Sequence, residues 1–70
     1  MPTICVRLLN EGTNAWRPVQ AEPVADGVYR IVEAMPPGEQ WEFFPGETVR
    51  CRRRRIMDSA EAMVAYERSP

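Results

Sequence analysis

Residues 41–52 read WEFFPGETVRCR, and the alternation of apolar and charged side chains in this stretch predicts a β-hairpin. Two short strands would meet at the turn Pro45-Gly46-Glu47, where proline fixes φ and glycine accepts a positive φ. The resulting register sets apolar opposite apolar and acid opposite base, which stabilises cross-strand pairs. The predicted pairs are Phe43 with Val49, Trp41 with Cys51, and Glu42 with Arg50. We therefore expect a small β domain whose core receives the apolar members of this hairpin.

Two segments nearer the N-terminus also favour strands. Residues 3–9 are rich in β-branched and aliphatic side chains, and alternate positions from Ile4 onward share an apolar face. Residues 16–24 make a less regular strand, because two prolines in it cannot donate to a ladder of hydrogen bonds. We expect this strand at a sheet edge, or bent by a bulge near Pro18.

A second hairpin is predicted at residues 25–27, where Ala-Asp-Gly gives a three-residue loop with glycine at the left-handed position. The returning strand covers residues 28–33. Its register again sets apolar opposite apolar and acid opposite base, with Ala21 facing Ile31 and Glu22 facing Arg30. Residues 34–39, which contain paired prolines, follow as a stiff connector.

The pattern changes after Arg55 and favours a helix over residues 58–68. Asp58 is a candidate N-cap, and Glu61 three residues later completes a capping box. About ten residues of helix are marginal alone. We therefore expect this helix to dock on the rest of the domain or on another chain.

These elements predict a mainly β fold in one domain over residues 1–70. Residues 3–54 would form a small SH3-like antiparallel barrel of about five strands, followed by the short C-terminal α-helix. An open sheet of three to five strands with the helix across one face is the alternative. Seventy residues allow only one thin core, since a chain of this size buries about 60% of its unfolded surface.

Composition narrows the function classes. Apolar residues at 44% and charged residues at 27% are ordinary for a globular chain, and a net charge of −1 gives no overall attraction to nucleic acid or anionic membranes. The absence of histidine removes the usual general base and the commonest metal ligand. The apolar run at residues 4–9 is too short for a signal peptide or a membrane span, so we expect a cytoplasmic protein.

Several motifs resemble a group of short bacterial proteins of unassigned function. They are Gly12, WRPV at residues 16–19, DGVY at residues 26–29, WEFFPG at residues 41–46, and Val49. The order and spacing of the predicted strands and turns are also similar to those of SH3-like barrels, including the KOW-type domains of ribosome- and transcription-associated proteins. The resemblance covers most of residues 3–52. It implies a small β-barrel and a binding module, and it carries over no catalytic residue.

Five of the nine basic residues fall in one run: Arg50, Arg52, Arg53, Arg54 and Arg55. Guanidinium groups match phosphates and stack on bases, so this run is a candidate nucleic-acid site. The favoured interpretation is that the arginines are solvated or pair with Glu39, Glu42 and the acids of the C-terminal helix, and contact with an acidic protein is a third possibility. Strict alternation would turn some of these side chains inward, so we expect the strand to end near Arg52 and the rest to lie in a linker.

A candidate partner-binding set comprises Trp16, Arg17, Tyr29 and Trp41. Aromatic side chains at strand starts form platforms for proline-rich peptides or bases in SH3-like grooves. Aromatic residues of so small a domain mostly fill its core, and this alternative is favoured for Trp41.

No constellation of residues predicts catalysis, a metal site or a cofactor. Cys5 and Cys51 lack a Cys-x-x-Cys spacing and point to different faces by strand parity, so we expect two reduced, buried thiols. Glu42 and Glu47 have no partner base or nucleophile in the pattern. Enzymatic activity is therefore not expected.

We expect a small non-catalytic binding module that engages a protein partner or a second copy of itself. The contact would use the Trp16-Arg17 edge, the other aromatics or the C-terminal helix. A dimer is expected because thin cores gain stability by pairing. The alternative function is binding of RNA or DNA through residues 50–55.

Overall fold

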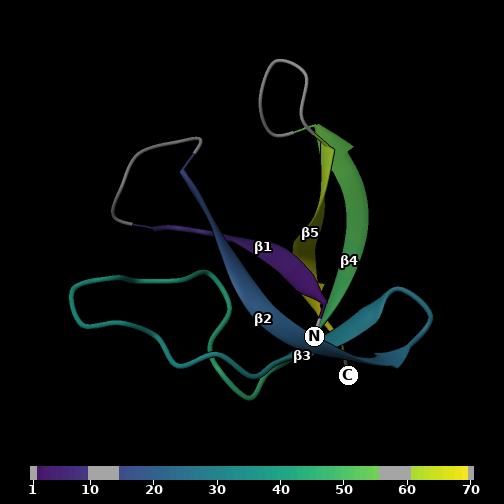
Figure 1. The fold of residues 1–70 in the computed structure, drawn as a ribbon, viewed down its shortest axis with the longest axis horizontal. Coiled ribbons are helices and arrows are strands. Elements are labelled where there is room, and N and C mark those ends of the chain that lie inside the picture. The colour runs from purple at the N-terminus through teal and green to yellow at the C-terminus, as the bar shows by residue number, and fades with distance from the viewer. Residues whose placement is uncertain (1, 10–14, 56–60, 70) are drawn as a thin grey trace.

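Five strands form the fold in the computed structural model, which describes residues 2–9, 15–55 and 61–69. The strands are β1 Thr3–Arg7, β2 Trp16–Ala25, β3 Val28–Ile31, β4 Thr48–Arg55 and β5 Glu61–Arg68. Each strand pairs antiparallel with the next, and a short parallel contact between β1 and β5 closes the ring (Figure 1). The parallel contact follows from the odd number of strands, because the first and last of five alternating strands run the same way. The described chain is thus an all-β, barrel-like ring of five strands, which confirms the predicted small antiparallel β fold in its general class.

The β2–β3 hairpin has the predicted register. Ala21 pairs with Ile31 and Glu22 with Arg30. The loop is shorter than predicted, since Ala25 already pairs with Val28 and only residues 26–27 form the turn. The register shifts between Pro23 and Ala25, so the bulge lies at that end of β2 and not at Pro18. In a ring β2 also has a partner on both sides, and Pro18 is accommodated opposite Cys5 with its side chain exposed.

The predicted strand pairing within residues 41–52 is wrong, whereas the prediction of which side chains in this stretch are buried is confirmed. Residues 42–47 lie in bends and turns, and Trp41 makes an isolated bridge to Leu8, while β4 pairs with β3 and β5. The four apolar side chains of the stretch are nevertheless buried: Trp41, Phe43, Val49 and Cys51. The predicted turn is present, because the amide of Glu47 donates to the carbonyl of Phe44 at 3.0 Å and Gly46 has a φ of 87°.

The predicted C-terminal helix is wrong. Residues 61–68 form β5, and the described residues contain no helix, hence none that could span a bilayer. The physical reason is that residues 61–68 lie between β4 and β1 in the ring. An extended segment can form backbone hydrogen bonds with both of these strands, whereas a helix forms its backbone hydrogen bonds within itself. The predicted cap at Asp58 lies outside the described residues.

The predicted linker after Arg52 is also wrong, because β4 continues to Arg55. Pairing between β4 and β3 ends at Arg50, whereas pairing between β4 and β5 continues to Arg55 opposite Glu61. Beyond Arg50, β4 therefore pairs with β5 alone among the described strands, and we call this part the β4–β5 ribbon. All four arginines on it are exposed, while Met63, the partner of Arg53 on β5, packs against the core.

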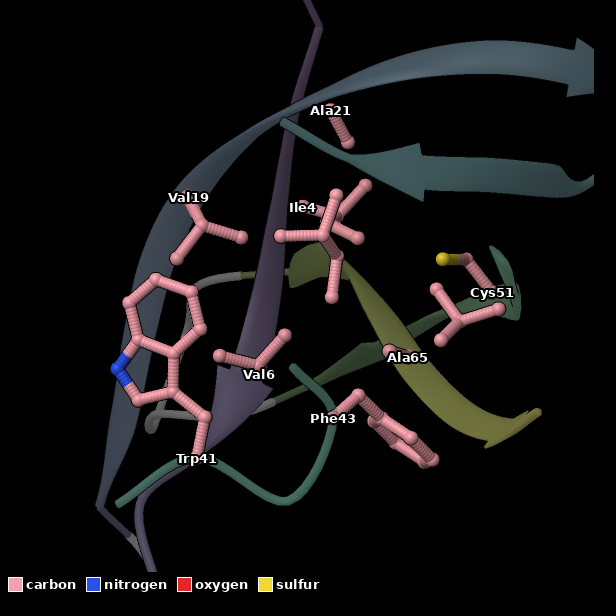
Figure 2. Close-up of a cluster of buried hydrophobic side chains, with 10 residues drawn as sticks. Ile4, Val6, Val19, Ala21, Trp41, Phe43, Cys51 and Ala65 are labelled. Atoms are coloured by element: carbon pink, nitrogen blue, oxygen red, sulfur yellow. The ribbon is translucent and has the colours of Figure 1, made fainter. Parts of the chain in front are cut away.

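One apolar cluster fills the ring (Figure 2). It draws on all five strands and on the segment between β3 and β4, and its members are Ile4, Val6, Val19, Ala21, Ile31, Trp41, Phe43, Val49, Cys51 and Ala65. Trp41 is the largest fully buried side chain. The segment between β3 and β4 thus supplies the core with two aromatic rings although it forms no strand.

Candidate binding surface

The four arginines at positions 52–55 are all exposed at the end of β4. Cys51, just before them, is 7% exposed and belongs to the core. Beyond it β4 pairs with β5 alone among the described strands, and the four arginine side chains are exposed. Successive strand residues point to opposite faces. Arg52 and Arg54 therefore share one face, and Arg53 and Arg55 share the other.

Arg54 reaches an aromatic ring on a distant strand. Its guanidinium carbon lies 5.7 Å from the centroid of the Trp16 ring, at the start of β2. Arg7, the partner of Trp16 across the β1–β2 ladder, has its guanidinium carbon 6.0 Å from the same ring. Two guanidinium groups, one from β1 and one from β4, thus lie against the same half-buried indole at distances typical of cation–π contacts.

Arg52 stacks over a second ring. Its guanidinium carbon lies 4.6 Å from the centroid of Tyr66 on β5. Arg50 pairs with Glu67 and Cys51 with Ala65, which leaves Tyr66 as the extra residue of a β-bulge. Tyr66 is 40% exposed. These two groups are linked through Arg52 and Arg54, which share one face of β4, and we call the set Arg7, Trp16, Arg52, Arg54 and Tyr66 the arginine–aromatic surface.

Acidic side chains pair with four arginines elsewhere in the described chain, but not with the arginines at 52–55. Arg17, Arg30, Arg50 and Arg68 each form an ion pair, with partners Glu33 and Glu39, Glu22, Glu67, and Glu47 respectively. Within the described residues no carboxylate forms an ion pair with any of the arginines at 52–55, although Glu61 is the cross-strand partner of Arg55. Of the predicted run, Arg50 alone forms an ion pair with another described residue, at 3.1 Å from Glu67.

The predicted partner-binding residues do not lie together on one exposed face. Trp16 joins the arginine–aromatic surface. Trp41 is fully buried and donates from Nε1 to Glu39 at 2.8 Å, so it offers no surface to a partner. Arg17 is held by two carboxylates, its Nε being buried without a hydrogen-bond partner, and Tyr29 packs half-buried against the core.

Sequence reasoning missed Arg7 and Tyr66. Arg7 lies in the predicted strand over residues 3–9, where its residue type gives no sign of a binding role. Tyr66 falls in the segment predicted to be a helix, and nothing in the local sequence indicates the bulge that turns it outward. The local sequence feature that favours a strand here is the pair Val64 and Tyr66, two strand-favouring residues at alternate positions among helix formers.

The two cysteines are free and buried, as predicted. Burial raises the pKa of the Cys5 thiol and raises that of Cys51 to about 11. At neutral pH both remain protonated, which makes them poor nucleophiles and poor metal ligands. Among the described residues, no group of three or more acidic or cysteine side chains is placed to hold a metal ion.

Glu47 supports the turn beneath β4. Its carboxylate accepts hydrogen bonds from Nε of Arg68 and, at 2.6 Å, from the backbone amide of Phe44. The Arg68 contact is the main reason that the pKa of Glu47 lies below its ordinary value. This group serves the fold and lies apart from the arginine–aromatic surface.

Comparison with protein-family models, with curated proteins and with solved structures finds no match to this chain.

Proposed function

We propose that this chain is a non-catalytic binding module whose ligand is a nucleic acid, held through phosphate contacts by the arginines at 52–55. The observation that carries the proposal is that four consecutive exposed arginines have no acidic partner in the described chain, while four other arginines do. Four uncompensated cations on one ribbon form a local positive field that the net charge of −1 conceals.

The stacking contacts support a binding role for these cations. A guanidinium held over an aromatic ring has lost part of its rotamer freedom before the ligand arrives, so less entropy is lost on binding. Arg52 over Tyr66 and Arg54 over Trp16 are held in this way. Stacking does not neutralise the charge, and both cations keep N–H donors for phosphate oxygens.

We further propose that the ring belongs to the SH3-like class of small barrels, as the sequence pattern suggested. The support is the sequential order of five short strands and the bulges that bend β2 and β5. Binding of a protein partner or of a second copy of the chain stays a prediction. Of the candidate residues for that role, Trp16 alone lies beside the arginines.

Salt-dependent binding tests the proposal. Affinity for labelled RNA and DNA, measured by fluorescence anisotropy over a range of salt concentrations, should fall with a log–log slope of about −3, since about four contacts each contribute roughly −0.7 on a single strand. Replacing Arg53 and Arg55 by serine should make the slope shallower by about 1.4. The matched control is Arg30→Ser, which removes an arginine that is already paired with Glu22.

Two results would count against a nucleic-acid ligand. One is absence of binding to any RNA or DNA at low salt. The other is tighter binding to poly-glutamate than to nucleic acid of equal charge, which would assign the arginines to an acidic protein partner. Sedimentation of the free chain at the same concentrations separates self-association from either form of binding.

A further inference from the structure

Tyr66 is an exposed aromatic side chain whose position the fold does not use for its core. The core cluster receives Ala65 from this part of β5, and the bulge displaces Tyr66 from the ladder. Tyr66 is 40% exposed, and its ring lies under the guanidinium of Arg52, which has no acidic partner among the described residues. This arrangement suits a ligand that carries both anions and flat rings.

We propose that Tyr66 is a base-stacking residue and that the nucleic acid bound by this surface is single-stranded. This inference rests on the proposed function and adds the class of ligand to it. A duplex buries the faces of its bases, so only an unpaired base can lie on a protein ring. Arg52, whose guanidinium lies over the same ring, is placed to reach the phosphate next to that base.

Trp16 is less suited to the same role. Two guanidinium groups, from Arg7 and Arg54, already lie over its ring, and the indole is only half-exposed. A base could stack there only after displacing one of them. Tyr66 has one such neighbour, so the geometry points to Tyr66 as the place where a base stacks and to Trp16 as the residue that orients cations.

The test compares a single-stranded oligonucleotide with a hairpin duplex of the same charge, at one low salt concentration. Loss of base stacking on an aromatic ring typically weakens binding by roughly 5- to 150-fold. Tyr66→Ala should weaken single-strand binding by a factor in that range and leave duplex binding unchanged. Tyr66→Phe should bind as the wild type does, because stacking needs the ring and not the hydroxyl.

Further variants keep the result interpretable. Tyr66→Leu retains apolar bulk at the bulge and should show the same loss as alanine, which separates lost stacking from lost folding. Phe44→Ala removes another exposed ring, 49% exposed, from the turn before β4 and should have no effect. Circular dichroism melts confirm that each variant is folded.

The outcomes distinguish the two levels of the proposal. Equal binding of both oligonucleotides by the wild type, with no effect of Tyr66→Ala or Tyr66→Leu, overturns the stacking role and leaves phosphate binding in place. No binding of either oligonucleotide overturns both. Strand-selective binding that depends on the ring at position 66 supports the inference.

Discussion

Replacing Trp41 by phenylalanine tests whether a residue outside the strands secures the barrel core. Trp41 has no exposed surface, and its Nε1 donates to one carboxylate oxygen of Glu39 at 2.8 Å. The other oxygen of that carboxylate accepts from Arg17 at 3.1 Å. The indole thus fills the core, and its hydrogen bond to Glu39 helps to hold the segment between β3 and β4 against Arg17 of β2. Phenylalanine removes the hydrogen bond and leaves a void.

The expected loss is large for so small a domain. A hydrogen bond to a charged group contributes about 1.5–3 kcal/mol. A void costs about 24 cal/mol per Å³, or roughly 1 kcal/mol for the volume by which tryptophan exceeds phenylalanine. We expect Trp41→Phe to lower the free energy of unfolding by about 2–4 kcal/mol. A domain of this length has about 4–10 kcal/mol in total.

Urea unfolding followed by far-UV circular dichroism measures the loss without relying on tryptophan fluorescence. A double-mutant cycle with Glu39→Ala isolates the side-chain contact, and we expect a coupling of about 1–2 kcal/mol. Glu39→Gln is the control, since it keeps an acceptor for the indole and removes the charge that pairs with Arg17. If Trp41→Phe costs less than about 0.5 kcal/mol, or if the two changes are additive, the tie between Trp41 and Glu39 is refuted.

Three further predictions concern pH and backbone conformation. Burial raises the pKa of Cys51 in the folded state to about 11, against 9.0 ordinarily. The free energy of unfolding should therefore be unaffected by this group below pH 9 and fall by about 3 kcal/mol between pH 9 and 11. Cys51→Ala should largely abolish this decline, as measured by urea titrations. The pKa of Glu47 is lowered by Arg68, so its contribution is present above the ordinary value of 4.5 and lost as pH falls below it; Glu47→Gln should flatten this acid limb in thermal melts. Gly27 has a φ of 73°, so Gly27→Ala should cost about 1 kcal/mol through backbone strain, although the added Cβ would meet only an ordinary contact at 3.7 Å; an unchanged unfolding midpoint would contradict this.

Local patterns predicted which side chains are buried better than they predicted which strands pair. The β2–β3 register follows from two pairs of residues across a short turn, and both pairs are present. At residues 41–52 the same reasoning identified the buried positions but chose the wrong partner for β4. Alternation fixes which way a side chain points, whereas the choice of partner depends on segments far away in the sequence, here β3 and β5.

The C-terminal error has the same origin. Residues 61–68 contain alanine, methionine and glutamate, which favour a helix in isolation. Their conformation is decided by the open hydrogen-bonding edges of β4 and β1, which become visible only once the ring is assembled. The error also hid the candidate site, because a helix would have placed Tyr66 away from Arg52. The arginine run itself was evident from the sequence, but its rings and its lack of acidic partners were not.

The hairpin of β4 and β5 links the proposed binding surface to closure of the ring. β5 joins β1 at the pair Cys5 and Val64, and Val64 is also the cross-strand partner of Arg52, the first of the arginines at 52–55. Neighbouring cations without acidic partners repel one another, so this end of the hairpin opposes the pairing that closes the barrel. A bound polyanion would remove that repulsion and would bind the folded ring more tightly than the open chain. By linkage, ligand binding and ring closure should stabilise each other, because both depend on the same two strands.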